Sequence, residues 1–96
     1  MIKSDLATVV VKASTKNYQK GRGGKKVCKI TPHHVAGVLT AEQIGNIFQN
    51  PKRVASSNYG IGNDGTIACY VGEENRAYTS SSRSNDEQAI TIEVSN

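Results

Sequence analysis

Tryptophan is absent from this chain of 96 residues, while phenylalanine occurs once and cysteine twice. Two cysteines are too few for the disulfide framework that holds many small secreted domains together. Cys28 and Cys69 each lie alone in a partly apolar segment, where a small buried thiol is the ordinary outcome. Neither belongs to a C-x-x-C pair, so the sequence does not predict a zinc knuckle built on cysteine.

Long hydrophobic runs are also missing. No apolar stretch approaches the roughly 20 residues that a membrane-spanning helix requires. Near the amino terminus, Asp5 and Lys12 bracket a short apolar run, which does not match the apolar core of a signal peptide. We therefore expect a cytoplasmic protein with no membrane partner.

Acidic residues are absent between Lys16 and Lys29, although the whole chain has 12 basic and 8 acidic residues and a net charge of +4. Such a stretch suits a phosphate-rich polymer, either nucleic acid or the anionic surface of a bacterial cell wall, or a solvated loop. Apart from Tyr18 it has no aromatic residue for base stacking, which disfavours nucleic acid. The basic residues concerned are Lys16, Lys20, Arg22, Lys25, Lys26 and Lys29.

What is present is a strand-rich pattern. Segments rich in β-branched and alternating apolar residues predict strands at 6–13, 27–33, 57–61, 66–71 and 89–94. Val27 and Ile30 are the expected apolar anchors of the second strand. Pro32 has no backbone N–H to donate, so we expect it at the end of this strand or on an edge strand. Residues 14–25 read as a mobile loop and residues 72–87 as a long polar connection.

A helix is predicted between Thr40 and Asn50. Thr40 and Gln43 form a capping box, the apolar stripe follows at helical spacing, and Asn50-Pro51 ends the helix. With the strands, this predicts a single α/β domain over residues 1–96, with a mixed central β-sheet and flanking helices. Little of the sequence is left to cover the sheet after residues 89–94, so we expect an incomplete domain.

Two residues carry candidate chemistry. His33 stands where a strand ends, a position typical of metal ligands, although a capping or core histidine is the alternative. Glu93 interrupts an apolar strand and points away from Ile92 and Val94. A carboxylate there either faces water from an edge strand or acts as a general base near a metal.

Three segments, taken in order, resemble the type 2 N-acetylmuramoyl-L-alanine amidases, in particular phage and prophage endolysins, whose fold is shared by peptidoglycan recognition proteins. Ile30–Gly37 matches hydrophobic-x-x-His-x-x-Ala-Gly, Ser56–Ile67 matches Ser-x-x-Tyr-x-Ile-x-x-Asp-Gly-x-Ile, and Asn85–Glu93 matches Asn-x-x-x-Ala-Ile-x-Ile-Glu. The segment 74–82 is similar to a family loop that often has tryptophan where this chain has Tyr78.

The resemblance implies roles for five residues. His33 would be the first zinc ligand and Glu93 the catalytic carboxylate, while Asn58, Tyr59 and Tyr78 would contact substrate. Neighbouring side chains of a strand point to opposite faces, so His34 is not expected to share the metal with His33. In the family, zinc activates the water that cleaves the amide between N-acetylmuramic acid and L-alanine of bacterial peptidoglycan.

The family also supplies a second histidine and then a cysteine or aspartate from later segments, and this sequence contains no counterpart to them. We therefore expect a partial amidase domain, inactive by itself, whose zinc ligands are completed by a second polypeptide. Homo-oligomerisation is an alternative way to cover the sheet. Such a protein would stay in the cytoplasm until release to the cell wall at lysis. The other functions considered are a non-catalytic peptidoglycan-binding module and a basic nucleic-acid-binding protein.

Overall fold

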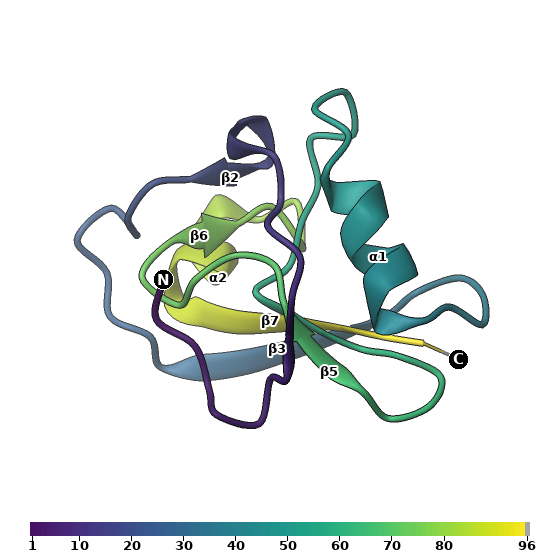
Figure 1. Cartoon of the computed structure of the whole chain (residues 1–96). Coiled ribbons are helices and arrows are strands. Elements are labelled where there is room, and N and C mark those ends of the chain that lie inside the picture. The colour runs from purple at the N-terminus through teal and green to yellow at the C-terminus, as the bar shows by residue number, and fades with distance from the viewer. Residues whose placement is uncertain (96) are drawn as a thin grey trace.

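A mixed sheet forms the centre of the molecule. In the computed structural model, which describes residues 1–95, helix α1 (Ala41–Phe48) lies along one side of this sheet (Figure 1). The β4–β5 pair is antiparallel and the other neighbouring pairs are parallel, so the predicted mixed α/β architecture is confirmed. The strands, in sheet order, are β1 (Val9–Val10), β5 (Ile67–Cys69), β4 (Tyr59–Ile61), β7 (Ala89–Val94) and β3 (Lys29–His34).

The predicted and observed strand boundaries agree best for β7, which lies inside the sheet. Strand β7 begins and ends at the predicted residues, and Pro32 lies inside β3 at the sheet edge. Strand β1 is shorter than predicted, because its flanking residues make scattered bonds instead of a regular ladder. The Thr8 N–H donates to the Ile67 carbonyl at 3.0 Å and the Val11 N–H to the Cys69 carbonyl at 3.1 Å.

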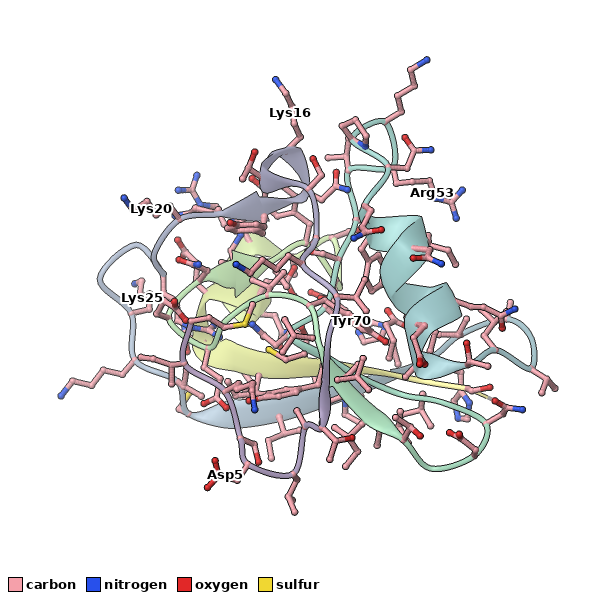
Figure 2. The ribbon with its side chains drawn as sticks, viewed as in Figure 1. Asp5, Lys16, Lys20, Lys25, Arg53 and Tyr70 are labelled. Atoms are coloured by element: carbon pink, nitrogen blue, oxygen red, sulfur yellow. The ribbon has the colours of Figure 1, made fainter. Side chains whose placement is uncertain are left out.

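The helix prediction is confirmed. Helix α1 (Ala41–Phe48) has the capping box, with the Thr40 hydroxyl accepting from the Gln43 N–H and the Gln43 side chain accepting from the Thr40 N–H. Its buried face packs on Tyr70, which Figure 2 shows in the interior beneath α1. The Phe48 and Tyr70 rings meet edge to face with 5.4 Å between centroids. Neither helix of residues 1–95 has the length and apolar character to cross a membrane.

The two segments predicted as loops are more ordered than expected. Residues 14–25 contain a short 3-10 helix, η1 (Thr15–Asn17), and strand β2 (Tyr18–Gln19), so the prediction of a mobile loop is wrong. The polar connection contains β6 (Arg76–Ala77), which pairs with β2, and helix α2 (Arg83–Gln88). Ser82 caps α2 by accepting from the Asn85 N–H.

The arm containing β2 is held by a buried guanidinium. Arg22 is 7% exposed, and it donates to the backbone carbonyls of Glu73 at 2.7 Å and Ala89 at 2.9 Å. Burial lowers the pKa of Arg22, and the nearby charges of Glu73 and Asp86 offset part of that effect. Arg22 is therefore a structural residue, whereas Lys16, Lys20 and Lys25 project outward along the same arm (Figure 2).

Asn58, which directly precedes β4, makes a second set of buried hydrogen bonds. Its side chain is fully buried, and its Oδ1 accepts from the Thr91 N–H at 3.1 Å. Its Nδ2 donates to the carbonyls of Val71 at 3.1 Å and Gly72 at 3.2 Å. Arg22 Nη2 approaches the same Oδ1 at 3.5 Å. We call Arg22 and Asn58 the polar hub.

The sheet face opposite α1 is open and apolar. A hollow of about 340 Å³ there is lined by Ser4, Leu6, Ile30, Tyr59, Ile61, Ile67, Glu73, Ile90 and Ile92, none of which belongs to a helix. Ile30 is 67% exposed, so the prediction that it anchors its strand in a core is wrong. Alternation along β3 places Ile30 on this open face and Thr31 on the face below α1.

The polar hub generates a stability prediction. Asn58→Ala leaves the buried Thr91 N–H and several carbonyls without a partner, so we expect a loss of about 3 kcal/mol or more in the free energy of unfolding. Urea denaturation followed by circular dichroism measures this loss. The matched control, Asn46→Ala on the exposed face of α1, should change the free energy by no more than about 0.5 kcal/mol. A loss below about 1 kcal/mol for Asn58→Ala would contradict the role of the hub.

Candidate functional site

His33 and Glu93 lie side by side on neighbouring strands. They are register partners in the parallel β3–β7 pair, so their side chains share one face of the sheet. Glu93 is also level with Gly60 of β4, at which an added Cβ would collide with Tyr70 under α1. The shared face is therefore the face that α1 covers, and both side chains are half-buried there. His34 alternates to the opposite face and is exposed.

A cleft beside α1 contains Glu93. It has a volume of about 410 Å³, and we call it the Glu93 cleft. Its wall combines apolar side chains of α1 with two cations that follow the helix, Lys52 and Arg53. Figure 2 shows Arg53 on the loop beyond the end of α1. The lining residues are Val35, Ile44, Ile47, Phe48, Lys52, Arg53, Ala55 and Glu93.

Sequence reasoning missed Lys52 and Arg53. They directly follow Pro51, which ends the helix, and an adjacent pair of cations at a helix exit was the available signal. Nothing in the pattern indicated that the loop turns back toward Glu93. In the fold, both exposed residues line the same cleft as Glu93, so its wall combines apolar and cationic side chains.

The environment of Glu93 favours its protonated form. Burial raises the pKa of the Glu93 carboxyl above its ordinary value, and the electrostatic effect of His33 offsets part of this rise. A carboxyl with a raised pKa holds its proton more tightly, so its carboxylate is a stronger base than that of an exposed glutamate. This is compatible with the role predicted for Glu93.

The residues present do not fit a catalytic zinc ion. Such a site needs three protein ligands and an open position. Within residues 1–95, no group of three or more His, Cys, Asp or Glu side chains is arranged so that it could hold a metal ion. Cys69 is buried on the other side of the sheet, and Cys28 donates to the Gln88 side chain at 3.5 Å. His33 and Glu93 alone are too few.

Two residues that were predicted to contact substrate, Asn58 and Tyr59, do not line the Glu93 cleft. Asn58 is fully buried, and its amide is used in the polar hub, so it cannot line a groove in this structure. Tyr59 packs on the open face with Ile92, opposite Glu93. Its hydroxyl donates to the Glu73 carboxylate and accepts from the Ser4 N–H at 2.6 Å; burial and the Glu73 bond raise its pKa. Both residues stabilise the fold.

Tyr78 remains at a surface. Its ring lies below the guanidinium of Arg76, with 4.7 Å from Cζ to the ring centroid. It lines a second hollow, which also contains Val54. Arg53 and Ala55, the sequence neighbours of Val54, line the Glu93 cleft and not this hollow. Tyr78 therefore lines a different hollow from the one that contains Glu93.

Comparisons with known proteins identify the fold. No family model matches the chain, and no curated protein sequence does. Among solved structures, a mutant endolysin from Bacillus subtilis matches with a TM-score of 0.72 and 18% sequence identity. The match covers 99% of this chain and 62% of the endolysin chain, so this chain spans less than two thirds of that structure. The chain thus has an endolysin-like fold.

The raised pKa of Glu93 predicts a pH dependence. The folded state binds the Glu93 proton more tightly than the unfolded state, so ionisation destabilises the fold as pH rises through both pKa values. We expect Glu93→Gln to raise the Tm by a few degrees at pH 7, and the difference from the parent chain to shrink toward pH 4. Thermal melts across this range measure the effect.

Glu42→Gln is the matched control for this measurement. Glu42 is exposed in the first turn of α1, where a negative charge is favourable, so its replacement should not raise the Tm at pH 7. A difference between Glu93→Gln and the parent chain that grows toward acid pH would contradict the pKa shift of Glu93.

Proposed function

We propose that this chain is a peptidoglycan-directed domain of the amidase type, acting in cell-wall lysis. The observation that carries the proposal is the pairing of His33 with Glu93 on the helix-covered face of an endolysin-like sheet. These are the residues to which the sequence resemblance assigns metal binding and catalysis. The neighbouring Glu93 cleft has the mixed apolar and basic lining that a sugar-peptide polymer with anionic groups requires.

The proposed reaction is hydrolysis of the amide between N-acetylmuramic acid and L-alanine. In it, His33 would be one of the residues that hold a zinc ion, and Glu93 would be the carboxylate that takes up a proton from water. Because His33 and Glu93 do not amount to a catalytic zinc site, we propose that a second polypeptide or a second copy of the chain supplies further ligands. By itself, the chain would bind peptidoglycan and not cleave it.

Binding to peptidoglycan without cleavage is a second candidate function. The incomplete ligand set favours it, since a module that only binds peptidoglycan has no need of a metal. Binding and cleavage are therefore best measured separately.

The binding experiment is co-sedimentation with purified, insoluble peptidoglycan. We expect the parent chain and Glu93→Gln to sediment to the same extent, because the carboxylate is assigned to catalysis. Equilibrium dialysis against zinc should show less than one ion per chain. If the parent chain did not sediment with peptidoglycan, the proposed function would be refuted. Binding of one zinc ion per chain would contradict the conclusion that the chain has too few metal ligands.

The cleavage experiment adds a polypeptide comprising the part of the Bacillus subtilis endolysin that the match does not cover. We expect the mixture to release peptides with a free amino-terminal alanine, detected by mass spectrometry. Loss of a general base slows such reactions by roughly 100-fold to 10,000-fold, so Glu93→Gln and His33→Ala should both abolish measurable release. His34→Ala, on the opposite face, is the control and should retain it. Loss of release with His34→Ala but not with His33→Ala would reverse the assignment.

A further inference from the structure

Basic residues from two separate segments lie on one side of the molecule. Lys16 and Lys20 belong to the amino-terminal arm, in η1 and just after β2, and Lys52 and Arg53 belong to the loop that follows α1. All four side chains are exposed. Figure 2 shows Lys16, Lys20 and Arg53 pointing outward at the margin of the molecule. We call these four residues the basic surface.

Asn17, which is fully buried, joins the two segments. Its Nδ2 donates to the backbone carbonyls of Phe48 at 2.7 Å and Asn50 at 2.8 Å, and its Oδ1 accepts from the Val54 N–H at 3.0 Å. These bonds hold the residue next to Lys16 against both ends of the loop that contains the other two cations. Two pairs of cations that are separate in the sequence are therefore brought together by the fold.

The charges of the basic surface are not neutralised by the protein itself. Neither ion pair of residues 1–95 includes any of the four cations. Glu74 lines a hollow together with Lys20, but its carboxylate binds the amino-terminal amine at 3.5 Å and the Ile2 N–H at 2.9 Å. Glu93, which lines the Glu93 cleft with the two loop cations, is half-buried and makes no ion pair with them. The basic surface therefore presents its positive charge to solvent.

The residue types of the basic surface suit phosphate groups. Three of the four are lysines, whose ammonium group is a compact charge that binds phosphate without a fixed orientation. The aromatic residue between Lys16 and Lys20 is Tyr18, which packs against the core cluster below α1 and is not presented for stacking. Single-stranded nucleic acids are held largely by bases stacked on exposed aromatic rings. The basic surface therefore fits a polyanion without bases better than a nucleic acid.

We propose that the basic surface binds an anionic polymer whose units are joined by phosphodiester groups. Point charges spread over two segments match a ligand that repeats its own charge along a chain, and such binding is driven by the release of counterions. The proposal rests on the proposed function for the location of this polymer, which is the bacterial wall. Because Lys52 and Arg53 also line the Glu93 cleft, polymer bound there would hold that cleft close to the wall.

Fluorescence anisotropy of end-labelled poly(glycerol phosphate), titrated with the whole chain, tests this proposal. For four contacts we expect a slope of about 3 for log Kd against log salt concentration, since each neutralised charge on a single-stranded polyanion contributes about 0.7. The double variant Lys16→Gln with Lys20→Gln, and the double variant Lys52→Gln with Arg53→Gln, should each halve this slope. At low salt each should also raise Kd roughly tenfold, since two exposed charge contacts are lost.

The control is Lys25→Gln with Lys26→Gln, which removes the same charge from the same arm beyond Arg22. These two lysines are exposed and lie outside the segments that Asn17 joins, so Kd should rise less than about threefold. An effect as large as that of the other double variants would mean that net charge alone decides binding, and would overturn the proposal. A loss of affinity with only one of those two variants would also overturn it, because the basic surface requires both segments.

Two further measurements separate the alternatives. Oligothymidylate with the same number of phosphates should bind no more tightly than poly(glycerol phosphate), and tighter binding would assign the surface to nucleic acid and overturn the proposal. Sedimentation is repeated with peptidoglycan from which hydrofluoric acid has removed phosphodiester polymers. A chain that binds this stripped peptidoglycan but not poly(glycerol phosphate) refutes the basic surface and leaves the proposed function. A chain that binds only poly(glycerol phosphate) refutes the proposed function and leaves the basic surface.

Discussion

The polar hub is the interaction on which the rest of the structure depends. Arg22 comes from the amino-terminal arm and bonds to the backbone on both sides of α2, while Asn58 ties the end of β4 to β7 and to the turn after β5. Each of these segments is short, and none forms a large apolar core of its own. Hydrogen bonds from these side chains to backbone groups therefore hold the segments together, a role that apolar packing has in larger domains.

The hub also fixes the position of the candidate site. Thr91, which bonds to Asn58, is two residues before Glu93 on the same strand and the same face. Holding Thr91 sets the register of β7 against β4, and the register decides that Glu93 lies below α1. The carboxylate is thus placed by a network that does not touch it.

Local signals in the sequence were enough to predict the elements but not the hub. Thr40 and Gln43 of the capping box are only three positions apart, and the strand 89–94 is rich in β-branched residues, so both could be recognised directly. Helix α2 was missed because it has six residues, all of them polar, after a run of serines. Arg22 and Asn58 were misread because their partners lie 13 to 67 positions away in the sequence, and residue type alone does not identify such partners. Motif resemblance singled out His33 and Glu93 as candidates, whereas Lys52 and Arg53 could be placed beside Glu93 only in the folded chain.

The sheet order has a consequence for how firmly the two candidate groups are held. Strand β7 lies between β4 and β3, whereas β3 is at the edge and pairs with β7. Glu93 therefore belongs to a strand anchored on both sides, and His33 to one that can open without disturbing the rest of the sheet. Local unfolding is easiest at such an edge. Opening of β3 alone would separate His33 from Glu93 while the β4–β7 pairing that holds Glu93 stays in place.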